Sequence, residues 1–225
     1  MEDGNLMNNL NVLYEDNHII VVEKPFNVLS QGDNTNDISL LDMVKNYIKK
    51  KYNKPGNVYI GLVHRLDRPV GGVMVFARTS KAASRLSESI RKNDFEKKYY
   101  AIVNGKFDKT VGRYIDKIKK LENGNSIISK DGKEAILDYK VVKYCKESDC
   151  SLVDISLLTG RHHQIRVQFA SHGHSLVGDQ RYGKQDRKQI CLYAYSLSFE
   201  HPVKSEKMIF NLQLPNFGDW TKFTI

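Results

Sequence analysis

A carboxylate between two guanidinium groups is the first arrangement in this 225-residue sequence that could do chemistry. Residues 62–72 read LVHRLDRPVGG, so Asp67 lies between Arg65 and Arg68, with apolar residues before and two glycines after. Neighbouring cations favour the ionised form of a carboxyl group. An ionised carboxylate can act as a nucleophile or stabilise a positive charge. From this stretch alone, a salt-bridged surface loop of small stability value is the more common outcome.

A second polar cluster lies in residues 157–183, LLTGRHHQIRVQFASHGHSLVGDQRYG. The spacing predicts a helix over residues 161–172 that buries Ile165 and Phe169 and ends at a glycine. Arg166 precedes an apolar valine, so we expect it to be partly buried and to need a carboxylate partner. Asp67 is one candidate for that partner, and the sequence leaves the pairing open.

Four histidines in the same segment raise the question of a metal site. They are His162, His163, His172 and His174. No set of carboxylates or cysteines completes a known ligand pattern around them, and the HExxH spacing is absent. The three cysteines of the chain also lack metal-site spacing. We expect no metal, and we expect the histidines to face solvent or a ligand.

A pair of tyrosines forms the third candidate. Tyr99 and Tyr100 occur in KKYYAIV, residues 97–103, which reads as a strand. Neighbouring residues of a strand point to opposite faces, so one ring can pack in the core while the other faces a cleft. A tyrosine on a basic surface can stack on a nucleobase. Two half-buried strand aromatics without such a role are the more common case.

The elements that must position these residues are strands, expected at short apolar runs, and two further helices, expected at helical spacing of apolar residues. Helices are expected after Ser39 and after Thr79 or Ser80, and residues 106–133 read as a hairpin or a variable, Lys-rich excursion. Strands are expected at 18–23, 59–63, 72–77, 97–103, 134–144, 151–158, 190–199 and 207–214. Many strands with few helices predict an α+β fold with a mixed, largely antiparallel sheet flanked by helices. We expect one domain over residues 11–225, preceded by a flexible N-terminus at residues 1–10.

The charge balance indicates the class of partner. Lys and Arg number 35 against 26 Asp and Glu, a formal net charge of +9. Such a balance is typical of proteins that bind a polyanion, most often nucleic acid, although many small proteins are simply basic. No stretch approaches the roughly 18 consecutive apolar residues of a membrane span, and the polar, acidic N-terminus is no secretory signal. We therefore expect a cytoplasmic protein without membrane contact.

Taken together, these motifs resemble the RluA-like family of RNA pseudouridine synthases. The resemblance rests on HRLD followed shortly by glycine, KxYxAxVxG at 97–105, and TGRxHQIR…GD..YG at 159–183. It extends to YEDNHIIVVEKPFNVLS at 14–30, DGKEAILDY at 131–139 and AYSLSFEHP at 194–202. Each motif alone is weak, but together, in the same order and spacing, the motifs are specific, and they cover nearly the whole chain.

The resemblance implies an enzyme that detaches uracil from uridine at N1, rotates it and rejoins it through C5, with no metal or organic cofactor. It implies that Asp67 is the nucleophile or stabiliser, that Tyr99 contacts the target base and helps to remove the C5 proton, and that Arg166 pairs with the aspartate. Arg65 is associated with displacing the target base from its stack. The residues expected to bind the substrate are His64, Arg65, Arg68, Arg161, His163 and Gln164.

The sequence departs from the family pattern at three places: Val70-Gly71-Gly72 after the aspartate, His162 before His163, and Tyr193 before the alanine of the late strand. None replaces Asp67, Tyr99 or Arg166, so we expect activity on ribosomal or transfer RNA. We expect a monomer without an extra N-terminal RNA-binding domain. A catalytically silent RNA-binding protein and a metal-dependent nucleic-acid enzyme are the alternatives.

Overall fold

The apolar run that follows the HRLD stretch forms strand β4 (Gly71–Ala77), and all seven of its residues are buried. β4 pairs antiparallel with β2 (Ile19–Lys24), in a register that sets Lys24 opposite Gly72. Strands that are buried on both faces carry apolar side chains at consecutive rather than alternating positions, and both strands do so. Together, β2 and β4 form a buried support for the HRLD loop.

The computed structural model describes residues 10–186 and 188–223, which form two compact units. The first unit holds the described residues up to Phe95 together with Leu197–Asn211, and the second holds the remainder. Strand β10 (Leu192–Glu200) contributes residues to both units. The flexible N-terminus expected at residues 1–10 lies, except for Leu10, outside the described residues, and a single domain over 11–225 stays a prediction.

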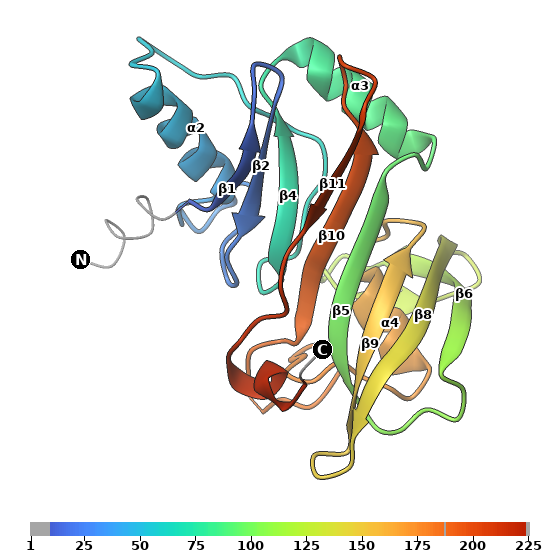
Figure 1. The fold of residues 1–225 in the computed structure, drawn as a ribbon. Coiled ribbons are helices and arrows are strands. Elements are labelled where there is room, and N and C mark those ends of the chain that lie inside the picture. Colours follow the sequence, from blue (N-terminus) through green and yellow to red (C-terminus); the bar gives the residue numbers. More distant parts are fainter. Residues whose placement is uncertain (1–9, 187, 224–225) are drawn as a thin grey trace. The chain divides into compact units, whose positions relative to one another are not determined.

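Three more strands and two helices complete the described part of the first unit (Figure 1). They are β1 (Val12–Glu15), α2 (Leu40–Lys51), β3 (Gly61–Leu62), α3 (Ser80–Arg91) and β11 (Lys207–Asn211). The strand order is β1-β2-β4-β10, with β3 paired to β4 and β11 paired to β10. Ser39 caps α2 and Thr79 caps α3, each by accepting a main-chain N–H of the first turn. The cap expected at Ser39 is confirmed, and Thr79 rather than Ser80 caps the second helix.

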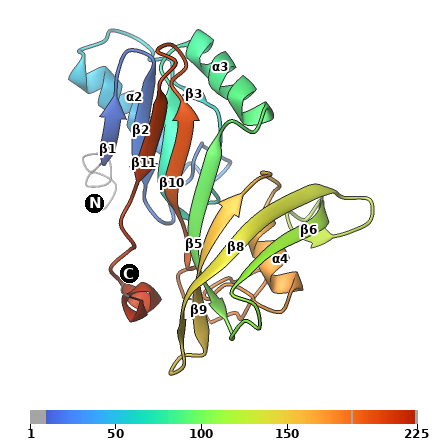
Figure 2. The ribbon, with the colours of Figure 1, turned by 45° about the vertical axis from the view of Figure 1, so that its right-hand side comes forward.

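In the second unit, one face of the strands packs against helix α4 (Figure 2). Its elements are β5 (Glu96–Asn104), β6 (Val111–Lys120), β7 (Ser126–Ile128), β8 (Lys133–Cys145), β9 (Cys150–Leu157), α4 (Gln164–Ser171) and the short 3₁₀ helix η1 (Gly218–Lys222). The strand order is β10-β5-β9-β8-β6-β7. Phe169 of α4 contacts the rings of Tyr114 on β6 and Tyr139 on β8. The hairpin expected within residues 106–133 is confirmed as β6 and β7.

The predicted α+β class with a mixed, largely antiparallel sheet flanked by helices is confirmed. The pairs β1–β2, β2–β4, β3–β4, β5–β9, β6–β7, β6–β8 and β8–β9 are antiparallel. None of the helices in the described ranges has the length and apolar character that crossing a bilayer requires.

Candidate functional site

The main chain on both sides of Asp67 is anchored by buried side chains of the first unit. Ser30 Oγ donates to the carbonyl of Leu66 at 2.7 Å and accepts the Leu66 N–H at 3.1 Å. On the other side, Lys24 Nζ donates to the carbonyl of Arg68 at 3.0 Å. Ser30 is 5% exposed and Lys24 is fully buried, whereas Asp67 is half-buried. The half-buried carboxylate therefore lies on a loop whose main chain is held by the buried side chains of Ser30 and Lys24.

Lys24 is a buried cation with three carbonyl acceptors, those of Pro25, Val28 and Arg68. Burial lowers the pKa of Lys24 to about 7, while the Asp67 carboxylate raises it and the Arg68 guanidinium lowers it. The effect of Asp67 on this pKa means that the two charges interact. Lys24 thus joins the Lys-Pro turn, which the sequence motif contains, to the loop of Asp67.

Replacing Lys24 by methionine should remove a pH-dependent part of the stability. Between about pH 7 and the ordinary lysine pKa of 10.5, the folded state binds fewer protons at Lys24 than the unfolded state. The wild type should therefore gain stability relative to Lys24→Met as the pH rises through this window. Denaturant unfolding of both proteins at several pH values measures the difference. Lys54→Met, at an exposed lysine, is the control; a difference that does not change with pH would contradict the prediction.

Three of the expected substrate-binding residues lie in the first unit around this loop. His64 Nε2 accepts the Val75 N–H at 3.1 Å, so this ring nitrogen carries no proton. Arg68 is exposed and forms an ion pair with Asp37 at 2.6 Å. Arg65 is exposed. The two arginines that flank Asp67 in sequence therefore reach the surface, while a buried lysine approaches the loop from the other side.

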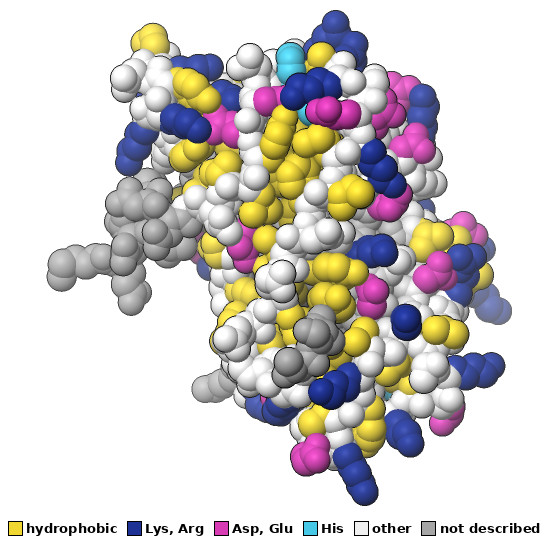
Figure 3. Space-filling view, in the orientation of Figure 1, with side chains coloured by type: hydrophobic (Ala, Val, Ile, Leu, Met, Phe, Trp, Pro, Cys, Tyr) yellow, Lys and Arg dark blue, Asp and Glu magenta, His cyan; other side chains and the backbone are white. Residues whose placement is uncertain are grey.

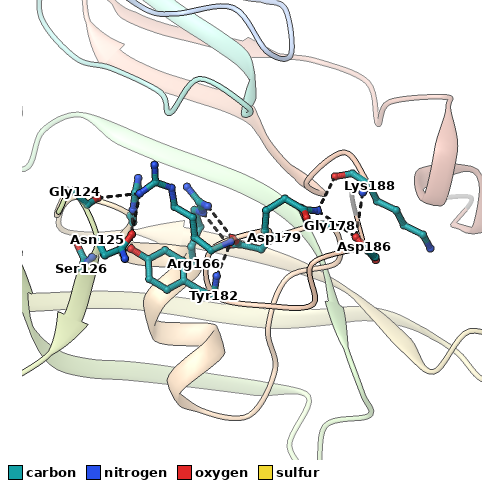
Figure 4. A network of polar contacts seen from close by, with 12 residues as sticks. Gly124, Asn125, Ser126, Arg166, Gly178, Asp179, Tyr182, Asp186 and Lys188 are labelled. Atoms are coloured by element: carbon teal, nitrogen blue, oxygen red, sulfur yellow. Dashed lines mark hydrogen bonds and ion pairs between the residues drawn. The ribbon is translucent and has the colours of Figure 1, made fainter.

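In the second unit, Arg166 is buried and forms a two-pronged ion pair with Asp179 (Figure 4). Its Nε and Nη2 each donate to one carboxylate oxygen of Asp179 at 2.8 Å, and the side chains are 5% and 0% exposed. Asp179 also accepts the main-chain N–H groups of Arg181 and Tyr182. Burial alone would raise the pKa of Asp179, but Arg166 and these N–H groups outweigh burial, so the pKa lies below its ordinary value. The expected burial of Arg166 with a carboxylate is confirmed, and its pairing with Asp67 stays a prediction.

A left-handed residue precedes the helix that carries Arg166. His163 has a φ of 54°, and α4 begins only at Gln164. The predicted start at residue 161 is therefore wrong by three residues, because a residue with positive φ cannot continue a right-handed helix. The ring explains how this conformation is held, since His163 Nδ1 and the Tyr182 hydroxyl are 2.8 Å apart. Such local strain is concentrated at functional sites.

Tyr182 connects this turn to the β6–β7 hairpin. Its hydroxyl accepts the Ser126 N–H at 2.8 Å, and its ring lies 5.3 Å from the Arg166 guanidinium carbon. Arg181 adds hydrogen bonds to the carbonyl of Gly124 and to the side chain of Asn125. The Lys-rich hairpin is therefore hydrogen-bonded to the loop that holds Arg166.

Two of the expected substrate-binding residues shape the turn before α4. Gln164 is buried, and its Oε1 accepts both the Thr159 hydroxyl and the Arg161 N–H. Arg161 Nε donates to the carbonyl of Glu134 at 2.7 Å. The structure thus gives both side chains contacts within the protein, while their contact with a substrate stays a prediction.

Tyr99 is buried on the face of the strands that α4 covers. It pairs with Ile155, which pairs with Tyr139, and Tyr139 contacts Phe169 of α4. Tyr100 therefore lies on the other face, where its ring stacks on Tyr195 at 3.9 Å. The expectation that the two tyrosines use opposite faces is confirmed.

Each of the four histidines that raised the question of a metal site contacts a different residue. His162 contacts the Ser126 hydroxyl, His163 contacts Tyr182, His172 contacts Asp116, and His174 contacts the carbonyl of Asn104. No group of three His, Cys, Asp or Glu side chains with metal-binding geometry occurs in residues 10–186 and 188–223. The His162 departure from the family pattern is accommodated by Ser126 at 3.0 Å.

Four residues that support the predicted side chains were not predicted: Lys24 and Ser30 in the first unit, and Asp179 and Tyr182 in the second. Each occurs in a motif that the sequence contains, namely YEDNHIIVVEKPFNVLS at 14–30 or the GD..YG stretch. The motifs therefore pointed to these four residues, although they did not show which groups the residues contact.

Known proteins share the sequence pattern and the fold of this chain. A family model described as RNA pseudouridylate synthase matches residues 18–171. An uncharacterized RNA pseudouridine synthase of Aquifex aeolicus is 34% identical over 220 residues, covering 92% of this chain and 70% of the relative. Ribosomal large subunit pseudouridine synthase D of Vibrio cholerae is 33% identical over 230 residues, covering 92% and 68%.

Among solved structures, human RNA Pseudouridylate Synthase Domain Containing 4 has the same fold. The TM-score is 0.81 at 21% identity, and the match covers 98% of this chain and 95% of the human chain. The family match and the two relatives lead to the same assignment. This chain belongs to the RluA-type family of RNA pseudouridine synthases, enzymes that isomerise uridine in RNA.

Proposed function

We propose that this enzyme converts specific uridines in ribosomal or transfer RNA to pseudouridine, with Asp67 as the nucleophile or as the stabiliser of the sugar cation. The observation that carries the proposal is the anchoring of the main chain on both sides of Asp67 by Ser30 and Lys24. A catalytic group has to be held in place by its supporting residues. Relatives of this chain include large-subunit synthases C and D, so ribosomal RNA is the first substrate to test.

The chemistry follows from the charge that develops when a glycosidic bond breaks. The sugar becomes positive, and a carboxylate at close range can stabilise it or form a covalent bond to it. A base inside folded RNA must first leave its stack, and the exposed Arg65 is the residue that we assign to this step. In the proposal, Tyr99 contacts the target base and helps to remove the C5 proton.

The role proposed for Arg166 is to keep Asp67 ionised and oriented. Its bidentate contact with Asp179 supports this role, because a guanidinium that is held on one side presents its remaining donors in a fixed direction. His64, Arg68, Arg161, His163 and Gln164 are proposed to hold the substrate. Basic and polar side chains of this kind bind phosphate and sugar groups.

Release of tritium from RNA labelled at uridine C5 tests the proposal. We expect the pure protein to release tritium from ribosomal or transfer RNA of cells that lack it, and to do so equally in the presence of a chelator. RNA that has already been modified by the wild-type protein is the matched control and should release none. Intact RNA binding without release from any cellular RNA would instead identify a silent RNA-binding protein.

A further inference from the structure

Two of the three cysteines face each other at the end of a hairpin in the second unit. Cys145 is the last residue of β8 and Cys150 is the first residue of β9, and the register of the two strands makes them direct partners. Direct partners in an antiparallel pair have side chains on the same face and Cα atoms roughly 4.5–5.5 Å apart. A disulfide needs a Cα separation of roughly 4.4–6.8 Å. Both cysteines are free thiols in this structure, and their place in the register suits a disulfide.

The turn at residues 146–149, which joins the two cysteines, is held by hydrogen bonds on both sides. Asp149 has a φ of 46° and accepts the Tyr144 hydroxyl at 2.9 Å. Its N–H donates to the carbonyl of Lys146 at 3.3 Å, and its carbonyl accepts the Gly105 N–H at 2.7 Å. The two strands therefore cannot slide apart at this end without breaking several contacts. Such a fixed pair favours a bond within the hairpin over a bond to a second chain.

Both thiols donate a hydrogen bond into this turn. Cys145 Sγ donates to a carboxylate oxygen of Glu147 at 3.2 Å, and Cys150 Sγ donates to the carbonyl of Ser148 at 3.1 Å. Glu147 and Ser148 are consecutive residues, so the two sulfur atoms are directed to the same end of the hairpin. The Glu147 carboxylate can also accept the Cys145 proton when the sulfur becomes a thiolate, which is the reactive form.

The two thiols differ in how easily a reagent reaches them. Cys145 is half-buried, whereas Cys150 is 7% exposed. Burial raises the pKa of the Cys150 thiol, and its hydrogen bond to Ser148 and the Lys222 ammonium offset this only in part. The turn forms the lower end of the second unit in Figure 1, and Figure 3 shows charged side chains on the surface there. A small polar oxidant from solvent therefore meets Cys145 first.

The third cysteine provides an internal reference. Cys191 is 2% exposed, and burial raises the pKa of its thiol to about 12. A thiol with so high a pKa is almost entirely protonated at neutral pH and reacts slowly, because the thiolate is the nucleophile. We therefore expect Cys191 to stay reduced while the other two cysteines react.

We propose that Cys145 and Cys150 are a redox modification site, at which a peroxide converts the two thiols to a reversible disulfide. The Cys145 sulfur attacks one oxygen of hydrogen peroxide, the O–O bond breaks, and a sulfenic acid and one water form. The Cys150 sulfur then attacks the Cys145 sulfur, the S–O bond breaks, and a second water leaves with the Cys150 proton. Two electrons thus pass from the thiols to the peroxide, and a dithiol reductant restores both thiols by exchange.

The bond would close one end of two strands whose other ends support the turn before α4. The carbonyl of Ile136 on β8 accepts Gln164 Nε2 at 3.1 Å and the Leu158 N–H at 3.2 Å. A disulfide stabilises a protein mainly because it restricts the unfolded chain. Oxidation should therefore raise the temperature at which the protein unfolds, and it replaces no contact of Arg166.

A count of free thiols tests the proposal. The whole chain is treated with equimolar hydrogen peroxide, denatured and alkylated. The reduced protein should take up an alkyl group at all three cysteines, whereas the oxidised protein should take up one, at Cys191, and a peptide map should join residues 145 and 150 within one chain. The unfolding midpoint should rise on oxidation and return to its former value with dithiothreitol.

Serine and alanine variants provide the matched comparison. Cys191→Ala should form the same disulfide, whereas Cys145→Ser should form none and show no rise of the unfolding midpoint. In Cys150→Ser, Cys145 should be oxidised further to the sulfinic acid, because the thiol that resolves the sulfenic acid is missing.

Three outcomes would overturn the proposal: three alkylated cysteines after peroxide treatment, a bond that includes Cys191 or a second chain, and sulfinic acid at Cys145 of the wild type. The last would mean that Cys150 does not reach the oxidised sulfur. The thiol count uses no RNA, so it succeeds or fails independently of the tritium assay for the proposed function.

Discussion

Asp67→Asn should lower the rate of tritium release by at least roughly 10³-fold, the scale seen when an essential nucleophile is removed. The amide has the size of the carboxylate but no charge, so it can neither stabilise a sugar cation nor attack it. The hydrogen bonds of Ser30 and Lys24 to the main chain of Leu66 and Arg68 are kept in the variant. Thermal stability should therefore change by no more than about 1 kcal/mol.

Affinity for RNA should survive the same change. Contacts of Lys and Arg with phosphate groups supply most of the binding to a nucleic acid, and the variant removes none of them. Asp37→Asn is the matched control, because it removes an exposed carboxylate that pairs with the neighbouring Arg68. It should retain nearly full activity. Activity of Asp67→Asn near that of the Asp37 variant would show that Asp67 has been given the wrong role.

The second large effect is expected at the ion pair of the second unit. Asp179→Asn leaves the Arg166 guanidinium buried without its carboxylate, and arginine does not lose its charge. Removing one partner of a buried pair costs about 3–5 kcal/mol, so the free energy of unfolding should fall by this amount. Tritium release should fall as well, since Arg166 loses the contact that orients it.

The exposed pair of Arg113 and Asp138 provides the control for this variant. It has the same bidentate form, with distances of 2.5 and 2.8 Å, but both side chains are more than 40% exposed. Asp138→Asn should therefore have little effect on stability. Equal losses for the two asparagine variants would mean that burial of the Arg166 pair contributes nothing.

The pH dependence gives an independent check on Asp179. Its pKa is lower in the folded state than the ordinary value of 3.8, so its contribution to stability is complete above that value and is lost as the pH falls through the lowered pKa. Asparagine does not titrate. The stability difference between wild type and Asp179→Asn should therefore narrow in acid, and a constant difference would contradict the assigned pKa direction.

Much of the fold could be predicted because the apolar runs are local signals. The strands around the HRLD loop, the strand of Tyr99 and the helix caps follow from residues within a few positions of one another. Strand ends were less accurate, since the last strand ends at Asn211 rather than at residue 214. Leu212, Gln213 and Leu214 continue the alternating pattern of a strand, so the sequence could not show where pairing stops, because that depends on the neighbouring strand.

The site was predictable only in part, because its supporting contacts span long sequence separations. Burial of Arg166 followed from its apolar neighbour, but the partner Asp179 lies in a loop without any periodicity. Lys24 sits in a Lys-Pro turn, which reads as exposed, and only the fold shows that its amine is enclosed by three carbonyl groups. The left-handed turn at His163 likewise depends on Tyr182, and no local pattern marks it.

The link between Tyr182 and the β6–β7 hairpin sets a rule for exchanging that hairpin between related enzymes. The hairpin donates a main-chain N–H at Ser126, not a side chain, to the Tyr182 hydroxyl. Every amino acid except proline supplies this donor, whereas the contacts of Asn125 with Arg181 and of the Ser126 hydroxyl with His162 depend on the side chain. A grafted hairpin should therefore fit when its length preserves the amide and it keeps Asn125 and Ser126, which leaves the other hairpin positions open to selection for a different RNA.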